Sequence, residues 1–238
     1  MMHRAVADPP PIAEPDEVGP PEADAPGVLR GDVWLTVQSW HAQRLISGRG
    51  ATLDKPAIIG LVGFADRLRV IWNAARADDP YADWWLIKID AALKRARQRI
   101  KQECEALDTL IKTHSTLRIS VAGTDKPYRV QLQFANPYAY WGAHVVAEFD
   151  TAARTILTAR HVGLISGADA EASLRGCSGA IRALFAVPQG YRVYRINRDA
   201  VAHGEDAAKS AAERMGELPS DVLSGEHVAA LAPRRARS

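Results

Sequence analysis

The chain has 238 residues, of which 47% are hydrophobic and 24% are charged, and its formal net charge is +2. This composition suits one compact globular unit, or two small ones, with enough apolar mass to bury a core. The two cysteines, Cys104 and Cys177, lie far apart, without C-x-x-C spacing or nearby histidine pairs. A disulfide framework and a zinc site are therefore not expected, and both cysteines are predicted to be small core residues.

The sequence carries no pattern typical of export or membrane insertion. Its N-terminal stretch lacks a basic segment followed by an apolar run. No window approaches the roughly 18 consecutive apolar residues that a membrane helix needs. We therefore expect a cytoplasmic protein with no membrane partner.

Charge is distributed unevenly along the chain. Residues 1–27 contain six acids and one base, which gives −5 and leaves +7 for the remainder. The same segment is rich in proline and almost free of bulky apolar side chains, so a disordered acidic tail is predicted over residues 1–27. The basic excess of the remainder is compatible with a polyanionic partner, although many inert domains carry a similar charge.

The first folded part is predicted over residues 28–115. A strand is expected over residues 32–40, where apolar and other side chains alternate in VWLTVQ. The stretch from this strand to Lys55 is ambiguous, and Pro56 is expected to open a helix that runs to about residue 77. Asp79 and Pro80 then start a long helix that reaches about residue 113. Two long neighbouring helices predict a helical hairpin.

The second part is predicted over residues 116–190. It begins with two strands, over residues 117–121 and 128–134, on either side of a turn-like segment. A helix is expected to start at Asn136 and to end near residue 163. A further helix is expected to follow and to stop at Pro188.

The C-terminal extension, residues 191–238, is predicted to be partly disordered. It holds one short strand candidate, residues 191–196, and weak helical signals. The predicted fold class is α+β and mostly helical, with a long helical hairpin joined to a unit in which a strand precedes two helices.

The order strand, helix, helix is that of the ribbon-helix-helix DNA-binding unit, in which two chains pair one strand each in the major groove. Side chains alternate between the faces of a strand, so Arg129, Gln131 and Gln133 are expected on the face opposite the apolar residues. Arginine matches guanine and glutamine matches adenine in bidentate geometry, worth about 1 to 3 kcal/mol of discrimination each. These three residues are predicted to read bases in double-stranded DNA.

The start of the second helix supplies a candidate phosphate contact at Ser166 and Gly167, since free amides and the helix dipole attract an anion there. Ser166 and Asp169 also have the spacing of an ordinary helix cap, and the pattern by itself favours an ordinary amphipathic edge strand with a solvated polar face. The first helix spans roughly 27 residues, or about 40 Å, which is long for this unit. A break near residues 141–142 would shorten it.

Six segments resemble a family of integrating conjugative element proteins, similar to the AcaB-like transcriptional regulators of conjugative plasmids. The most unusual string is DDPYADWWL, inside the third segment. The segments are HAQRLISGR (41–49), KPAIIGLVGFADRLRVIW (55–72), ARADDPYADWWLIKID (75–90), FANPYAYWGA (134–143), ILTARHVGLI (156–165) and GELPSDVLSG (216–225).

The resemblance implies a ribbon-helix-helix fold and a dimeric, non-enzymatic DNA-binding regulator of transfer genes. It does not identify base-reading residues, and it leaves open whether residues 32–40 or 128–134 form the ribbon. A second hypothesis is a protein-interaction factor that assists conjugative transfer without sequence-specific DNA binding, with the aromatic segment YADWW as its contact surface. Neither hypothesis involves a cofactor, a metal or a small-molecule substrate.

Other groups of reactive residues are better explained by structure than by chemistry. Asp79 and Asp83 suit the start of a helix, where carboxylates bind free amides and favour the dipole. Cys177 in GCSG lacks an identifiable base and is expected in the core. The segment GRGAT lacks the ending of a phosphate-binding loop. We therefore predict no catalytic residue.

Overall fold

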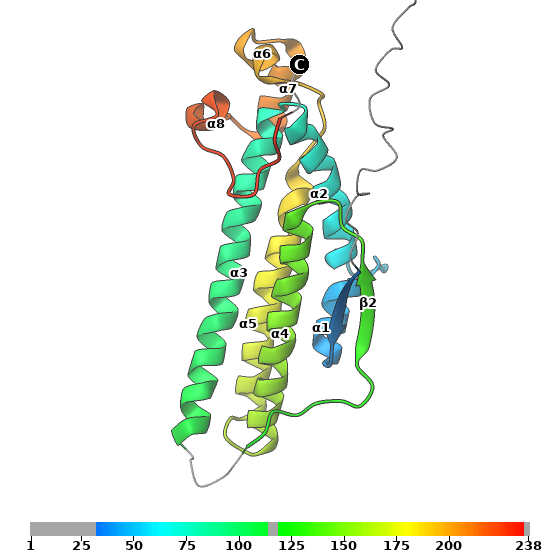
Figure 1. The fold of residues 1–238 in the computed structure, drawn as a ribbon, viewed down its shortest axis with the longest axis vertical. Helices are drawn as coiled ribbons and strands as arrows, with labels where there is room; N and C mark the ends of the chain where they lie inside the picture. The colour runs from blue at the N-terminus through cyan, green and yellow to red at the C-terminus, as the bar shows by residue number, and fades with distance from the viewer. Residues whose placement is uncertain (1–31, 114–118, 236–238) are drawn as a thin grey trace, which may run out of the picture. The chain divides into compact units, whose positions relative to one another are not determined.

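The computed structural model describes residues 32–113 and 119–235, and the acidic tail predicted over residues 1–27 lies outside them (Figure 1). The predicted mostly helical α+β class is confirmed. The elements in chain order are β1 (Val33–Val37), α1 (Trp40–Ser47), α2 (Leu61–Arg76), α3 (Pro80–Thr113), β2 (Tyr128–Leu132), α4 (Pro137–His161), α5 (Gly167–Ala186), the 3-10 helix η2 (Val187–Gly190), α6 (Arg198–Ala202), α7 (Asp206–Met215) and α8 (Ser220–Ser224).

Four helices, α2 to α5, pack around one hydrophobic core that spans both predicted folded parts (Figure 1). The rings of Phe64 on α2 and Phe185 on α5 lie 4.8 Å apart between centroids. Burial of such aromatic and branched side chains removes apolar surface from water and is the main force that holds the helices together. No helix among the described residues is long and apolar enough to cross a membrane.

Helix α4 is continuous over 25 residues, so the break considered near residues 141–142 is absent. Gly142 instead allows close packing, because a Cβ at this position would lie 2.8 Å from Cε1 of Phe64. Asn136 caps the helix as its sequence predicts, since its side-chain oxygen accepts a hydrogen bond of 3.0 Å from the Ala139 amide. The resulting helix is longer than the first helix of a ribbon-helix-helix unit.

The predicted start of α3 is confirmed and that of α2 is wrong. Asp79 Oδ1 accepts hydrogen bonds from the amides of Tyr81 (2.8 Å) and Ala82 (3.2 Å), directly before Pro80 begins α3. Pro56 does not open a helix. Arg49 and Ile58 exchange two backbone hydrogen bonds of 2.8 Å, which hold this segment in a tight turn and delay α2 to Leu61.

The two strands form an antiparallel ribbon within one chain, with Leu35 opposite Val130 in the register. This differs from the expectation that β2 pairs with its counterpart in a second chain. It also answers the question left open between the two strand candidates, because both contribute to the same ribbon. The other expected strand is absent where it is described, since residues 119–121 belong to no strand.

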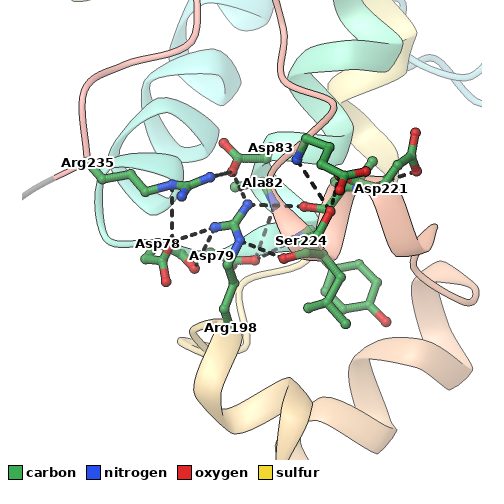
Figure 2. A network of polar contacts seen from close by, with 12 residues as sticks. Asp78, Asp79, Ala82, Asp83, Arg198, Asp221, Ser224 and Arg235 are labelled. Carbon is green, nitrogen blue, oxygen red and sulfur yellow. Dashed lines mark hydrogen bonds and ion pairs between the residues drawn. The ribbon is translucent and has the colours of Figure 1, made fainter.

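The segment after η2 contains three short helices, and the strand expected at residues 191–196 is absent, because these residues belong to no strand and Arg195 has a φ of +54°. A polar network connects this segment to the start of α3 (Figure 2). Arg198 donates to the carboxylates of Asp78 and Asp83 and to the carbonyl of Leu223. Arg235 also pairs with both carboxylates. These contacts attach α6 and α8 to the helix bundle.

Candidate nucleic-acid interface

The ribbon has one face toward the protein and one toward solvent. Leu35, Val37 and Leu132 are buried on the inner face, where β1 packs against α4. The outer face carries the side chains that alternate with them. Its exposed members are Trp34, Thr36, Arg129 and Gln131, and Gln133 is exposed just beyond the end of β2.

Two of the predicted base-reading residues contact side chains of the β1 segment: one contacts an aromatic ring and the other a carboxylate. The guanidinium of Arg129 lies 5.5 Å from the ring centroid of Trp34. Gln131 Nε2 donates a hydrogen bond of 2.8 Å to Asp32 Oδ1. Both side chains remain on the solvent side, so each is available for exchange with an external partner. The Asp32 carboxylate would therefore compete with a nucleobase for the side-chain amide of Gln131.

A buried carboxylate holds the end of β1 in place. Asp150 on α4 is 4% exposed and accepts hydrogen bonds from the amides of Gln38 (2.9 Å) and Ser39 (2.7 Å). The Ser39 hydroxyl in turn accepts from the Ala42 amide at 3.2 Å and caps α1. A buried charge is tolerated when backbone amides replace its water. The strand and α1 are therefore fixed to α4 at one point.

The segment that leads into β2 is also attached to α4. Arg154 Nε donates to the Ala122 carbonyl at 2.7 Å, and Thr158 Oγ1 accepts from the Ala122 amide at 2.9 Å. Gln38 Oε1 accepts from the Thr124 amide at 3.1 Å, which connects the segment to the end of β1. The end of β1 and the segment that precedes β2 are thus both hydrogen-bonded to α4.

Ser166 caps α5 as predicted, but no contact joins it to the ribbon residues. Its hydroxyl accepts from the Asp169 amide at 3.1 Å and donates to Asp169 Oδ2 at 2.6 Å. Gly167 is exposed as the first residue of α5. Figure 1 places the start of α5 at the end of α4, whereas β2 lies beside the body of α4. The Asp169 carboxylate already occupies the positive end of the helix dipole.

Comparison with known families decides the identity of the fold. The family model described as transcriptional regulator AcaB matches residues 25–235. The chain belongs to the AcaB family of transcriptional regulators. The crystal structure of selenomethionine-containing AcaB from uropathogenic E. coli is similar to this chain with a TM-score of 0.56 and 14% sequence identity, over 82% of this chain and 95% of that one. No curated protein matches the chain.

The aromatic segment of this AcaB-family chain is packed largely into the core. Tyr81 and Trp85 are buried, and Trp84 is half-buried. Trp85 Nε1 donates to the Val187 carbonyl at 3.0 Å. Lys88 Nζ lies 3.2 Å and 3.7 Å from the ring centroids of Trp84 and Trp85, and burial lowers the pKa of Lys88 to about 8.

The acidic residues at the start of α3 bind protein groups. Asp79 accepts a hydrogen bond of 2.6 Å from the Tyr191 hydroxyl in addition to the amides that it caps. Burial raises the pKa of Asp79, although those hydrogen bonds oppose the shift. Asp83 pairs with Arg198 at 2.7 Å and does not cap the helix (Figure 2). Within residues 32–113 and 119–235, no group of three potential metal ligands occurs.

Cys177 is a core residue in this regulator, as its sequence context predicts. The residue is fully buried on α5, and burial raises the pKa of its thiol to about 11. A thiol with such a pKa is protonated at neutral pH and is a poor nucleophile. Cys104 is half-buried on α3, and burial together with nearby carboxylates raises its pKa as well.

Proposed function

We propose that this protein is a DNA-binding transcriptional regulator of an integrating conjugative element and that it inserts the outer face of its β1–β2 ribbon into the major groove of an operator. The observation that carries the proposal is an exposed two-stranded ribbon whose outward side chains include Arg129 and Gln131. The major groove of B-DNA, about 12 Å wide, admits a two-stranded ribbon.

The outer face has the chemistry of direct base recognition. Arg129 suits the O6 and N7 acceptors of guanine, and Gln131 and Gln133 suit the N6 and N7 groups of adenine. Thr36 lies opposite Arg129 in the register and adds a hydroxyl and a methyl group to the same face. The proposed phosphate contact at Ser166 and Gly167 uses the free amides of α5, and the Asp169 carboxylate weakens it.

We further propose that the regulator acts as a homodimer. A sheet of two strands leaves one backbone edge of each strand without a partner among the described residues, and such an edge accepts a strand from another chain. Two-fold symmetric dimers bind two half-sites about one helical turn apart. Sedimentation equilibrium of the full chain, free and with a duplex that carries two half-sites, tests this state.

The base-reading assignment is tested with the double variant Arg129→Ala, Gln131→Ala. We expect it to lose about tenfold to 100-fold of the preference for promoter DNA of its own element over a scrambled duplex, from about 1 to 3 kcal/mol per bidentate contact. Fluorescence anisotropy with both duplexes measures this ratio. The matched control is Arg95→Ala, Gln98→Ala, which removes the same residue types from the exposed surface of α3.

The two ways in which the proposal fails are distinct. A double ribbon variant that keeps the wild-type preference, with an unchanged far-UV spectrum and melting temperature, excludes the ribbon as the base-reading surface. A wild-type chain that binds neither duplex at low salt excludes sequence-specific DNA binding and favours an interaction factor.

A further inference from the structure

Three arginines from separate parts of the chain lie close enough for their charges to interact and have no acidic partner among the described residues. Arg44 lies on α1, Arg49 in the turn that follows, and Arg182 on α5, which packs against α1. Among residues 32–113 and 119–235, no carboxylate forms an ion pair with any of them. Arg44, Arg49 and Arg182 are called the arginine cluster below.

The charges of the cluster act on one another and on a neighbouring histidine. Burial, followed by the charges of Arg44 and Arg49, lowers the pKa of Arg182. Burial, followed by the charges of Arg44 and Arg182, lowers the pKa of His41. Like charges that are not neutralised within the fold raise its free energy, and an external anion relieves this cost.

The turn that carries Arg49 is built tightly enough to fix its guanidinium. Gly48 has φ +71°, and a Cβ there would lie 2.4 Å from the Ile58 carbonyl oxygen. Arg49 Nη2 donates to the Pro56 carbonyl at 3.0 Å, whereas Arg49 Nε is buried and has no acceptor among the described residues. A buried donor without an acceptor is costly.

An exposed aromatic side chain completes the surface. Trp40 is 64% exposed, and the guanidinium of Arg44 lies 4.6 Å from its ring centroid. Such stacking orients a guanidinium while its N–H groups stay free for a planar acceptor. Trp40 begins α1 directly after Gln38 and Ser39, whose amides bind Asp150, so this surface is fixed together with the end of β1.

We propose that the arginine cluster binds the phosphodiester backbone of the DNA whose bases the ribbon reads. This inference rests on the proposed function. Guanidinium groups match phosphate oxygens in bidentate geometry, and phosphate contacts fix the register of a base-reading element on the duplex. Arg44 lies on α1, the helix that follows β1 and is held to the end of that strand by the Asp150 hydrogen bonds, so a backbone contact there helps to position the ribbon in the groove.

The test uses the double variant Arg44→Gln, Arg182→Gln. Both side chains are exposed and neither donates a hydrogen bond within the described chain, so the fold is expected to persist. We expect at least a tenfold loss of affinity for operator and scrambled duplexes alike at about 0.1 M salt. The slope of log K against log salt should fall by about 2, which corresponds to one phosphate for each arginine.

The matched control is Arg95→Gln, Arg175→Gln, which removes the same two charges from α3 and α5. Arg175 is paired with Glu171 at 3.3 Å, and Arg95 is exposed on α3. The control should keep the wild-type slope to within about 0.5. An equal loss in both double variants assigns the effect to net charge and overturns the proposal.

Other outcomes separate this inference from the proposed function and from a small-anion site. A wild-type slope in the cluster variant, with the ribbon variant impaired, overturns only the inference. Absence of duplex binding by the wild type overturns both. Melting with and without tripolyphosphate distinguishes the ligand source: stabilisation that depends on the cluster, together with unchanged duplex binding, identifies a free-phosphate site and overturns the backbone contact.

Discussion

The arginine cluster and the C-terminal polar network use the same side chain in opposite ways. Arg198 is surrounded by the carboxylates of Asp78 and Asp83, and its side chain is 14% exposed (Figure 2). Arg44 and Arg182 have no such carboxylate among the described residues and remain at the surface. An arginine that neutralises a buried acid stabilises the fold, whereas one without an acid is available to a partner.

The densest run of basic residues in the sequence consists mostly of side chains that are paired with carboxylates. Residues 94–101 of α3 read KRARQRIK. Four of these five bases lie near carboxylates: Lys94 with Asp90 at 2.7 Å, Arg97 with Glu148 at 2.8 Å, Arg99 with Glu103 at 2.9 Å and Lys101 with Glu105 at 3.7 Å. Charge density along a sequence is thus a poor guide to where a folded protein attracts an anion.

The largest expected effect is on the stability of the fold, when an arginine of the C-terminal polar network is removed. Arg198→Ala leaves Asp83 buried with only Arg235 at 3.4 Å as a partner, and we expect the free energy of unfolding to fall by about 3 kcal/mol. Arg182→Ala, which removes an exposed and unpaired arginine, should change it by less than about 0.5 kcal/mol. Urea denaturation measures both. Equal losses would show that the two regions do not differ.

The run on α3 is expected to give a smaller effect. Arg97→Gln removes an ion pair to Glu148 in which both side chains are more than one-third exposed, and it should cost about 0.2 to 1 kcal/mol of stability. DNA affinity should stay within about twofold of the wild type, because Glu148 already neutralises this charge. A loss of affinity as large as that of the cluster variant would place the DNA contact on α3.

The smallest expected effect is on the pKa of His41, which reports how close the arginine cluster lies to this residue. With Arg44 and Arg182 both changed to Gln, the pKa of His41 should rise but stay below 6.5, because burial is the larger cause of its depression. Titration of its ring proton by NMR measures this. No rise would mean that the arginines lie too far from His41 to form one surface.

The depressed pKa of His41 also fixes the sign of a pH effect. A histidine with a folded pKa below its unfolded value stabilises the fold when it is neutral. This contribution is complete above about pH 6.5 and is lost as the pH falls through that value toward the folded pKa. Urea denaturation of wild type and His41→Gln across this range should diverge in that direction.

Much of the local structure was predictable from the sequence because it depends on neighbouring residues. Asn136 and Ser166 cap the helices that follow them, and Pro80 begins α3. The alternation around Arg129 and Gln131 predicts which side chains face solvent once a strand forms. Pro56 failed as a helix start because backbone bonds between Arg49 and Ile58 hold the segment in a turn instead.

Strand pairing and the gathering of charges depended on contacts far apart in the sequence. A strand can pair along either of its two edges, and its residues do not specify which other strand pairs with it. The pairing of β2 with β1 of the same chain was therefore not predictable from the sequence of β2. Arg44 and Arg182 look like isolated surface residues until α1 packs against α5.

The sequence by itself determined the helical character, the helix caps, the core positions and the two faces of β2, because propensity and periodicity act over a few residues. Only the tertiary structure decided that β1 pairs with β2. It also decided which basic side chains are neutralised by carboxylates. Ion pairing falls off over a few ångströms in space, and sequence separation contains no measure of that distance.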